Sequence, residues 1–568
     1  MAELILGLHA GVNATAAIGD ASGVRYCVQE ERLTGEKGYI GFPSHAVMAC
    51  LKELSATPSE VAAIAYGSHS GQVDYCGRDD LTQRLRSFHR RPDLPGRLLD
   101  ERRRAARRPD GLPRRLATHL ARAGLGGIPL TCYDHHTTHG AAAYYGLRDG
   151  PATPYLVMTC DGFGDGACAT VAVWKQGQRR ELARTGLRSS LGLLYFWTTH
   201  AYGFRPHEDE YKLMGMAPHG SPQRAAEIAG IYGRYLGLDE TGLRFRRQTR
   251  LSTELSWPRL AGDLRGHRFD DVFAGLQRFT EEMLAGRTES AVQSAGLRRV
   301  LAGGGVFMNV KACQRIAALP VVESFEAFPS CGDESLAIGA YYLAAAGHYG
   351  QAAVPPLAHC FLGDDISDDE ARSALSTGEF TAQRPSDITA AVAGLLAQGE
   401  IVARCAGRME FGARALGNRS ILADPGNADL PRVLNQLVKR RDFWMPFAPA
   451  ILSSRQLAYI RNPKRLPSPY MMLAFDSRPD AIQDFIAAMH GADLTCRPQL
   501  VPDGLDCGLR DILRAYDTRT GRAVLLNTSL NLHGKPIART ARDALHVFRH
   551  SGLRYMQLGP YLICKENT

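Results

Sequence analysis

Short apolar runs alternate with amphipathic stretches along the first part of the chain, a pattern typical of α/β proteins. Apolar strands are predicted at residues 4–7, 24–29 and 62–66, and an amphipathic helix is predicted to begin at Pro43. Strand hairpins followed by helices indicate a layered domain built on a mixed sheet.

Two strand-turn-strand units with Gly and Asp or Asn turns occur in this region. The first runs from the strand at 4–7 through a turn at 11–13 into a second strand. The other has an apolar strand at 155–160, a turn at 161–166 and a returning strand at 169–174. Each turn alone is consistent with an ordinary hairpin. Together they predict an internally duplicated nucleotide-binding fold, in which glycines let the backbone approach a phosphate or a metal.

A glycine triplet follows the strand predicted at 299–301. Gly303, Gly304 and Gly305 stand between this strand and a helix that is predicted to start near Asn309. Glycines at such a junction remove side chains that would block a phosphate or adenosine from the backbone. A glycine triplet alone does not establish a nucleotide site.

The stretch 134–145 is predicted to open a buried helix, and it carries two histidines four residues apart. His135 and His139 therefore share one helix face and can direct both imidazoles at one spot, as in a metal chelate. Two histidines at a helix start can equally be capped or hydrogen-bonded core residues. Elsewhere, Asp161 ends a strand and Asp333 lies near a helix N-terminus, where both carboxylates are available as ligands.

The composition turns to Gly, Ala and Pro around residues 350–356, which indicates a boundary between domains at 1–350 and 357–568. Beyond it lies a group of basic residues suited to a doubly charged small anion, namely Arg414, Arg419, Lys439, Arg440 and Arg441. Solvated surface arginines are the alternative. A strand at 523–526 ends in hydroxyl and amide side chains at 527–531 that are able to close such a pocket.

The chain has 568 residues, too many for one core, so two or more domains are expected. Its net charge of +9 is concentrated between about Arg78 and Arg122. This segment has leucines at helix-like intervals and no interleaved aromatic residues, which favours an Arg-rich amphipathic helical insert over a nucleic-acid surface.

The thirteen cysteines include no C-x-x-C pair, so reduced and mostly buried thiols are expected. The N-terminus lacks a basic segment followed by a long apolar run, and no apolar stretch approaches the length of a membrane span. We therefore expect a cytoplasmic protein.

The motifs, in their order, resemble the O-carbamoyltransferase family of natural-product biosynthesis, which includes carbamoyltransferases of antibiotics and nodulation factors. The resemblance covers nearly the whole chain. It rests on ordered motifs, which are Gln29-Glu30-Glu31-Arg32, His135-x-x-x-His139, Cys160-Asp161-Gly162, Glu210-Tyr211-Lys212-Leu213-Met214-Gly215, Ala302-Gly303-Gly304, Gly412-Ala413-Arg414-Ala415-Leu416-Gly417 and Leu526-Asn527-Thr528-Ser529.

The resemblance implies that residues 1–350 adopt a Kae1-like fold, the duplicated ASKHA architecture of actin and Hsp70. This domain would transfer the carbamoyl group and hold a divalent metal, iron(II) in first place, with zinc or manganese as alternatives. The implied metal ligands, which are also implied to be catalytic, are His135, His139, Asp161 and Asp333. Further residues implied to contact a cofactor are Gly303, Gly304, Gly305, Asn309, Lys212 and Asn13.

Residues 357–568 are implied to form a YrdC-like α/β domain that binds carbamoyl phosphate and ATP with Mg²⁺. The implied binding residues are Arg414, Arg419, Lys439, Asn527 and Ser529, and of these Arg414 and Lys439 would also be catalytic. In the family, carbamoyl phosphate and ATP yield a carbamoyl-adenylate in this domain. The adenylate then moves internally to the metal site, where an acceptor hydroxyl attacks its carbonyl and AMP leaves.

One departure from the family pattern concerns the turn near the N-terminus. Many members carry His-Asp there, whereas this chain has Val12-Asn13. Because that histidine is thought to assist the acceptor hydroxyl, its role needs a replacement, for which His9 or a metal-bound water is a candidate.

Other functions remain open at this point. An enzyme of tRNA threonylcarbamoyladenosine synthesis with fused Kae1-like and YrdC-like domains is the main alternative. Hydrogenase-maturation carbamoyltransferases share both domains but carry C-x-x-C pairs, which this chain lacks. An ATP-responsive scaffold is a non-enzyme alternative. For the carbamoyltransferase we expect a small-molecule hydroxyl acceptor, no nucleic acid or membrane partner, and a monomer or homodimer.

Overall fold

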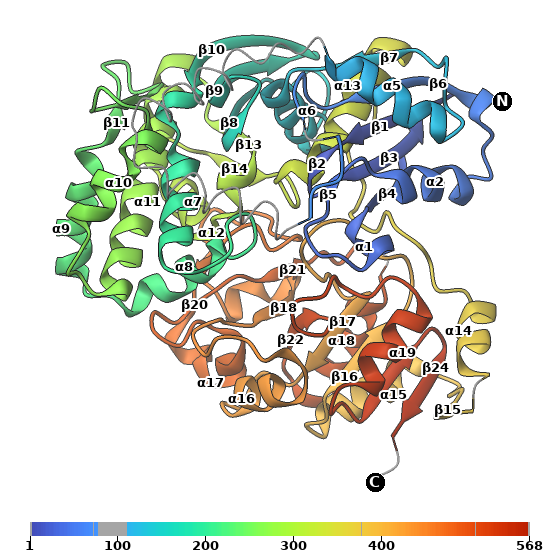
Figure 1. Ribbon diagram of the computed structural model, residues 1–568. Helices are drawn as coiled ribbons and strands as arrows, with labels where there is room; N and C mark the ends of the chain where they lie inside the picture. The colour runs from blue at the N-terminus through green and yellow to red at the C-terminus, as the bar shows by residue number, and fades with distance from the viewer. Residues whose placement is uncertain (1–2, 72, 78–110, 377, 506, 566–568) are drawn as a thin grey trace. The chain divides into compact units, whose positions relative to one another are not determined.

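The computed structural model describes residues 3–71, 73–77, 111–376, 378–505 and 507–565 (Figure 1). The chain divides into two compact units. Unit 1 comprises Met1–Glu31 and Gly38–Ala358, and unit 2 comprises Arg32–Lys37 and His359–Thr568. Both units combine sheets with helices, which confirms the predicted α/β class.

The first sheet of unit 1 has five strands in the order β4-β3-β1-β6-β7. They are β1 (Leu4–His9), β3 (Thr15–Asp20), β4 (Gly23–Gln29), β6 (Val61–Tyr66) and β7 (Leu130–Cys132). Strands β1, β3 and β4 form an antiparallel meander, while β6 and β7 run parallel to β1. Two short strands, β2 (Gly11–Val12) and β5 (Ile40–Gly41), form a separate antiparallel pair.

The second sheet repeats this arrangement with the order β10-β9-β8-β13-β14. Its strands are β8 (Tyr155–Gly164), β9 (Ala167–Lys175), β10 (Gln178–Gly186), β13 (Arg299–Gly303) and β14 (Ser324–Ala327). Again the first three form an antiparallel meander and the last two run parallel to the first. The repeated order confirms the internal duplication that the two hairpins predicted.

Each sheet of unit 1 is followed by a buried helix. Helix α6 (His135–Leu147) comes after β7 and packs on β8 and β13, while α13 (Leu336–Tyr349) comes after β14 and packs on β1 and β6. The two helices also pack on each other (Figure 1). Their close approach requires Gly339, because a Cβ there would lie 2.1 Å from the carbonyl oxygen of Thr138. Helices that are buried on all sides need the small and apolar residues found here.

The remaining helices of unit 1 lie mainly between β10 and β13 in the sequence. They are α7 (Leu191–Ala201), α8 (Glu210–Met216), α9 (Pro222–Gly233), α10 (Thr253–Asp263), α11 (Phe269–Ala295) and, after β13, α12 (Val310–Ala318), with the small strands β11 (Leu236–Leu238) and β12 (Phe245–Arg247). Near the N-terminus are α1 (Glu31–Thr34) and α2 (Ser44–Glu53).

The Arg-rich segment is described only in its last part. Helix α5 (Leu112–Arg122) buries Leu112, Leu116 and Leu120 along one face, which confirms an amphipathic helix there. Residues 78–110 of the predicted insert lie outside the described residues.

Unit 2 is built on a mixed eight-stranded sheet with the order β15-β24-β23-β16-β17-β22-β18-β21. The strands are β15 (Thr381–Gln383), β16 (Val402–Cys405), β17 (Arg419–Ala423), β18 (Ala448–Leu452), β21 (Gln499–Val501), β22 (Val524–Ser529), β23 (Tyr555–Leu558) and β24 (Tyr561–Cys564). The helices are α14 (Asp368–Leu375), α15 (Ile388–Ala397), α16 (Leu430–Leu434), α17 (Ile482–Phe485), α18 (Gly508–Thr520) and α19 (Ala541–Arg549).

Strand β8 differs from the predicted strand and turn. It continues to Gly164, with an irregular register between Cys160 and Gly164, so Asp161 lies in a distorted stretch of strand rather than in a turn. All thirteen cysteines are unpaired, and only Cys132 and Cys564 are not fully buried. None of the described helices combines the length and the apolar composition that a bilayer crossing requires.

Candidate functional site

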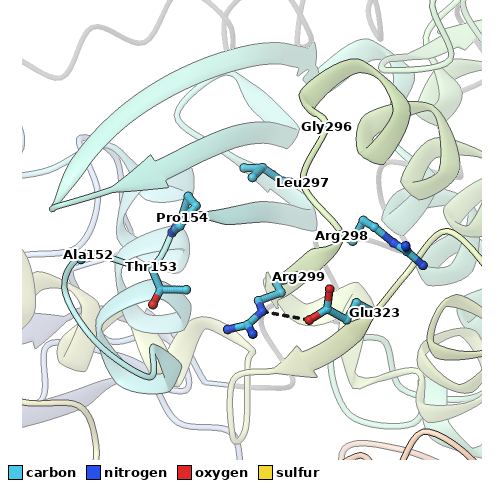
Figure 2. Close-up of a pocket in the computed structure, with 8 residues that line it drawn as sticks. All are labelled: Ala152, Thr153, Pro154, Gly296, Leu297, Arg298, Arg299 and Glu323. Atoms are coloured by element: carbon cyan, nitrogen blue, oxygen red, sulfur yellow. Dashed lines mark hydrogen bonds and ion pairs between the residues drawn. The ribbon is translucent and has the colours of Figure 1, made fainter.

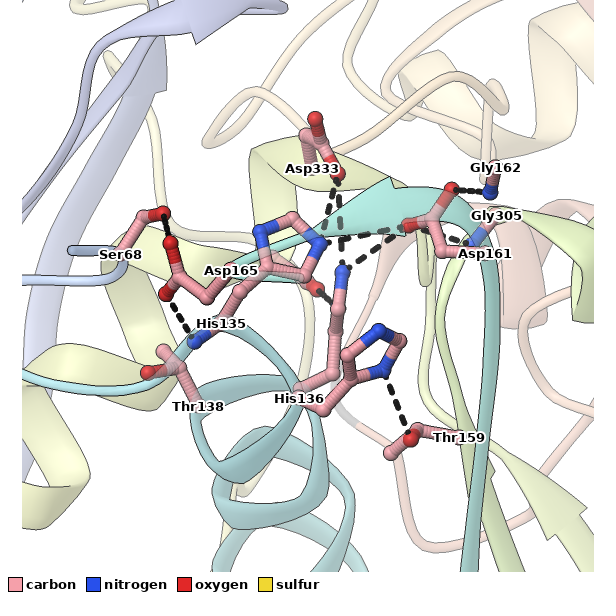
Figure 3. Close-up of polar contacts among 12 residues, drawn as sticks. Ser68, His135, His136, Thr138, Thr159, Asp161, Gly162, Asp165, Gly305 and Asp333 are labelled. Atoms are coloured by element: carbon pink, nitrogen blue, oxygen red, sulfur yellow. Dashed lines mark hydrogen bonds and ion pairs between the residues drawn. The ribbon is translucent and has the colours of Figure 1, made fainter. Parts of the chain in front are cut away.

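Four of the predicted side chains converge in unit 1, and Figure 3 shows His135, Asp161 and Asp333 among them. One potential ligand atom from each of His135, His139, Asp161 and Asp333 lies within 4.8 Å of the others. Nε2 of His139 is 3.1 Å from Oδ2 of Asp161 and 3.5 Å from Oδ1 of Asp333. Nε2 of His135 is 3.7 Å from the same two oxygen atoms. We call these four residues the His-Asp cluster.

The duplicated fold explains why the cluster forms. His135 and His139 lie in the first two turns of α6, and their four-residue spacing places them on one face as predicted. Asp161 lies near the carboxyl end of β8, and Asp333 follows β14, which shares a parallel ladder with β13 and β8. The carboxyl ends of parallel strands form one edge of a sheet, where such sites commonly occur.

Neighbouring groups hold the cluster residues in place. Nδ1 of His139 lies 3.1 Å from the hydroxyl of Ser335, so its Nε2 faces the carboxylates. Oδ1 of Asp161 accepts a hydrogen bond from the backbone N–H of Gly162 at 2.6 Å, and Oδ2 accepts one from Gly305 at 3.3 Å. Such supporting contacts are typical of side chains that orient toward a metal.

The charges within the His-Asp cluster shift the pKa values of its residues in the direction opposite to the effect of burial. Burial by itself lowers the pKa of His139, but its hydrogen bonds to Asp161 and Asp333 outweigh this and raise the pKa to about 9. Burial by itself raises the pKa of Asp161, but the neighbouring imidazoles of His135 and His139 hold it well below its usual range. The two carboxylates therefore favour a positive charge at their common focus.

The donor set fits a divalent metal. Nε2 of His135 is buried, and no hydrogen-bond partner for it occurs among the described residues, although it points at the focus of the cluster. Two imidazole nitrogens and two carboxylate oxygens suit zinc, iron(II) or manganese. The His-Asp cluster is thus a candidate metal-binding group.

His9 and Asn13 lie beside the cluster. Nε2 of His9 is 3.9 Å from Oδ2 of Asp333, but it also lies 3.2 Å from the carbonyl oxygen of Val12, and the ring is 3% exposed. Burial, above all, lowers the pKa of His9 to about 4. Asn13 has a left-handed backbone (φ 57°), and its side-chain amide donates to Glu334 at 3.3 Å.

The glycine triplet packs against the cluster. A Cβ on Gly303 would lie 2.8 Å from the carbonyl oxygen of His139, and one on Gly304 would lie 2.4 Å from that of Cys160. Gly305 donates its N–H to Asp161. These glycines therefore allow β13 to approach the ligand-bearing elements, whatever else they contact. Nucleotide contact stays a prediction for all three.

Asn309 and Lys212 are engaged within unit 1. The side chain of Asn309 caps α12 through the N–H of Ala312 at 3.0 Å and exchanges two hydrogen bonds of 2.9 Å with Gln277. The ammonium of Lys212 lies 3.3 Å from Asp209 and 5.5 Å from the ring centroid of Phe204. Their predicted contact with a cofactor is untested.

A second group of charged residues lies in unit 2, around Lys439. This lysine ends a π-helical turn (Asn435–Lys439) and is 2% exposed. Its ammonium donates to the hydroxyl of Ser529 at 3.1 Å, to Oδ1 of Asn531 at 2.8 Å and to the carbonyl oxygen of Ser529. No carboxylate pairs with it in the described part of the chain. Burial, and then the charges of Arg441 and Lys37, lower its pKa well below 10.5.

Arg497 belongs to the same group and was missed by the sequence analysis. Burial, and then the positive charges of Arg414 and Arg441, lower its pKa well below its usual range. Arg497 makes no hydrogen bond or ion pair with any other described residue. In the sequence, the available signal was a lone cation between Cys496 and Pro498. We call Arg414, Lys439, Arg441 and Arg497 the cationic cluster.

Arg419 has a different environment from Arg414. Its side chain is fully buried, and its guanidinium donates to the carbonyl oxygens of Gly407 at 2.8 Å, Asp364 at 3.0 Å and Arg539 at 3.0 Å. These bonds tie three segments together. These bonds give Arg419 a structural role in unit 2, so we leave it out of the cationic cluster; its contact with carbamoyl phosphate stays a prediction.

Glu410 organises the loop that carries Arg414. It is 2% exposed, and its Oε1 accepts hydrogen bonds from the backbone N–H groups of Leu416, Asn418 and Arg419 at 2.8, 2.8 and 3.0 Å. Arg404 binds the same loop through a carbonyl group instead of N–H groups: its guanidinium donates to the carbonyl oxygen of Gly417 at 2.6 Å. The loop conformation therefore depends on two buried and oppositely charged side chains.

Asn527 and Ser529 lie on β22, next to this loop and to Lys439. The amide of Asn527 donates to the carbonyl oxygen of Ala415 at 3.1 Å and to Gln499 at 2.8 Å. The hydroxyl of Ser529 donates to Asn531 at 2.6 Å. Both residues therefore border the cationic cluster.

A pocket of about 510 Å³ in unit 1 lies elsewhere (Figure 2). Its two arginines already have partners: Arg299 pairs with Glu323 at 3.1 Å, and Arg298 donates to the carbonyl oxygens of Pro320 and Val321. Because both arginines are already paired within the protein, this pocket is a weaker candidate for binding an anion than the cationic cluster.

Two family models match the chain. The model described as carbamoyltransferase N-terminus matches residues 113–342, and the one described as carbamoyltransferase C-terminus matches residues 393–565. The chain belongs to the carbamoyltransferase family. It is accordingly a carbamoyltransferase enzyme, which confirms the resemblance. The His-Asp cluster lies in the first match and the cationic cluster in the second.

Several relatives are similar over most of the chain. An uncharacterized protein of Synechocystis is 29% identical over 99% of this chain and 96% of its own length. Nodulation protein NolNO of Sinorhizobium fredii is 28% identical over 95% of this chain and 77% of its own. Nodulation protein U of Rhizobium tropici is 30% identical over 47% of this chain and 44% of its own. These matches favour carbamoyl transfer over tRNA threonylcarbamoyladenosine synthesis.

The solved structures found are remote. HypF of T. kodakarensis is 12% identical and covers 61% of this chain and 48% of its own, with a TM-score of 0.32. Component A of the (R)-2-hydroxyglutaryl-CoA dehydratase of Acidaminococcus fermentans is 13% identical, and the match covers 60% of this chain and 99% of its own, with a TM-score of 0.30.

Proposed function

We propose that this carbamoyltransferase uses ATP to activate carbamoyl phosphate and transfers the carbamoyl group to a hydroxyl of a small natural product. Unit 2, with a YrdC-like fold, makes the activated carbamate. Unit 1, with a Kae1-like fold, uses it. The convergence of His135, His139, Asp161 and Asp333 carries this proposal, because two imidazoles and two carboxylates make a centre suited to group transfer from a phosphate ester.

The cationic cluster of unit 2 suits carbamoyl phosphate. Burial disfavours the positive charges of Lys439 and Arg497, Arg441 adds a third cation beside them, and a bound dianion would neutralise this charge. Carbamoyl phosphate, ATP and water would give carbamoyl-adenylate, pyrophosphate and phosphate. The arginines would hold phosphate oxygens in forked hydrogen bonds, and Lys439 would stabilise the charge that develops on the departing group.

The His-Asp cluster suits the second half-reaction. A divalent metal bound there, iron(II) in first place, would act as a Lewis acid on the phosphate oxygen on which AMP leaves. His135 and His139 would hold it from α6, and Asp161 and Asp333 from the sheet edge. The acceptor oxygen forms a bond to the carbamoyl carbon, the bond from that carbon to the adenylate oxygen breaks, and AMP departs with the electron pair.

The acceptor hydroxyl must lose its proton during this step. His9 lies beside the cluster, with Nε2 3.9 Å from Asp333, and burial keeps it neutral. Its position on β1 makes it the replacement for the histidine that Val12 displaces. We therefore propose that His9 assists the hydroxyl, and that the acceptor belongs to secondary metabolism, such as an antibiotic.

A two-step assay tests the proposed function. The protein is mixed with labelled ATP and carbamoyl phosphate, and pyrophosphate release that depends on carbamoyl phosphate is expected. Release that depends instead on bicarbonate and threonine would support the tRNA pathway, and ATP binding without turnover would support a scaffold. A mass-spectrometric screen of hydroxylated metabolites for the gain of a carbamoyl group then identifies the acceptor.

A further inference from the structure

Asp165 lies at the tip of the hairpin between β8 and β9 and takes no part in the proposed chemistry. Its backbone is left-handed (φ 49°), a conformation that most side chains avoid and that aspartate tolerates better than most. A residue held in this conformation needs support from its surroundings. The contacts of its carboxylate provide that support.

The carboxylate of Asp165 accepts four hydrogen bonds. Its Oδ1 accepts from the hydroxyls of Ser68 at 2.9 Å and Ser70 at 2.7 Å. Its Oδ2 accepts from the backbone N–H groups of His69 at 2.8 Å and His135 at 2.8 Å. All four donors are neutral, and both oxygens are occupied. Figure 3 shows the carboxylate between Ser68 and the first residue of α6.

The bond to His135 matters because of where that amide lies. His135 is the first residue of α6, and the first N–H groups of a helix have no partner within the helix. Asp134 satisfies the N–H of Thr137 at 2.9 Å, whereas Asp165 satisfies that of His135. A carboxylate at this end of a helix is also favoured by the helix dipole. The start of α6 is thereby fixed to the β8–β9 hairpin.

The same hairpin also holds the ring of His135. A Cβ on Gly164 would lie 2.2 Å from Cγ and Cδ2 of that ring, so the imidazole lies directly on the glycine backbone. Gly164 therefore supports the ring, and the adjacent Asp165 fixes the amide of the same histidine.

His135 depends on this arrangement more than His139 does. His139 has a hydrogen bond to Ser335 through Nδ1 and one to Asp161 through Nε2. For the ring nitrogens of His135, no hydrogen bond is found within the described residues, and Nε2 is 3.7 Å from the carboxylates. The direction of its Nε2 is therefore set through the backbone and through packing.

We propose that Asp165 is a positioning residue for the metal site: it fixes the first turn of α6 so that Nε2 of His135 meets Asp161 and Asp333. The inference rests on the proposed metal centre. It predicts that metal affinity depends on a carboxylate that does not touch the metal, as residues that orient ligands commonly affect affinity by about 10- to 100-fold.

Co²⁺ titration of the metal-free full-length protein tests this inference. Asp165→Asn replaces one acceptor oxygen by an N–H₂ group, which faces either the hydroxyls or the two backbone donors. We expect its dissociation constant for Co²⁺ to rise by about tenfold or more. We also expect the visible Co²⁺ absorption to change, because the arrangement of ligands changes. A purely structural role would leave this spectrum unaltered.

The matched control is Asp134→Asn, which makes the same carboxylate-to-amide change at the same helix end. Asn still caps Thr137, and only the ion pair with Arg184 at 3.1 Å is lost. Co²⁺ affinity within twofold of the wild type is expected. Should Asp165→Asn fail to fold, the double variant Ser68→Ala/Ser70→Ala removes two of the four bonds and should weaken Co²⁺ binding several-fold.

The outcomes separate this inference from the proposed function. If the wild type binds Co²⁺ and the Asp165 and serine variants bind it equally well with the same spectrum, the positioning role is overturned and the metal centre stands. Equal weakening by Asp134→Asn would also overturn it, because a general loss of helix capping would then be the cause. A wild-type protein that binds no metal would remove both proposals.

Discussion

Lys439→Met gives the sharpest test of the cationic cluster. The substitution keeps most of the volume of a side chain that is 2% exposed and removes its charge. In the free protein, the side chain of Lys439 is buried near Arg441 with no carboxylate partner among the described residues, which lowers its pKa. A bound dianion would supply the missing negative charge.

The expected loss of affinity follows from this contact. A hydrogen bond to a charged group contributes about 1.5–3 kcal/mol, which corresponds to a rise of about 10- to 150-fold in the dissociation constant for carbamoyl phosphate. The pH dependence has a definite sign. Burial lowers the pKa of Lys439 in the free protein and a bound anion would raise it, so binding takes up a proton at a pH between the two values, and affinity should fall as the pH rises through the lowered pKa.

Isothermal titration calorimetry in two buffers with different ionisation enthalpies measures both the affinity for carbamoyl phosphate and the number of protons taken up on binding. At a pH between the free and the bound pKa of Lys439, the wild type should take up protons on binding carbamoyl phosphate, and Lys439→Met should bind more weakly without that uptake. Lys535→Met provides the control, since Lys535 is exposed in the same unit. It should match the wild type in affinity and in proton uptake.

The lowered pKa of Lys439 also makes the stability of the ligand-free protein depend on pH. A lowered lysine pKa means that the unfolded chain binds the proton more tightly, so wild-type stability should decrease as the pH falls from 10.5 through the lowered pKa. This contribution should be absent in Lys439→Met. A folded variant that binds carbamoyl phosphate with wild-type affinity and the same proton uptake would refute the assignment of the anion site.

Three further predictions concern other parts of the molecule. His139→Ala should abolish carbamoyl transfer while pyrophosphate release that depends on carbamoyl phosphate remains measurable; equal loss of both half-reactions in a folded protein would contradict the division between the units. Glu410→Ala leaves three loop N–H groups without their acceptor, so the KM for carbamoyl phosphate should rise about tenfold or more, and Glu410→Gln, which keeps an acceptor oxygen, should show a smaller rise in the same steady-state assay. Trp174→Ala removes a side chain that is 1% exposed and whose ring centroid lies 5.1 Å from that of Tyr144. It should lower the free energy of unfolding, measured in urea titrations, by about 3–5 kcal/mol. A loss below about 1 kcal/mol would contradict this packing.

The sequence alone predicted those features that depend on neighbouring residues. Apolar runs located the strands of both hairpins, and their similarity predicted the duplication that the two sheets display. The four-residue spacing of His135 and His139 fixed their common helix face, because the geometry of a helix is local. The ordered motifs led to the correct family.

The tertiary structure alone decided which distant residues meet. Asp161 and Asp333 are far apart in the sequence, and only the parallel ladder of β8, β13 and β14 brings them to one edge. Arg414 and Arg419 are five residues apart, yet the guanidinium of Arg419 points inward and donates to five backbone carbonyl groups. Arg497 joins the cationic cluster from another segment. Periodicity within a short segment fixes local geometry, whereas the direction of a buried charge depends on partners that only the complete fold supplies.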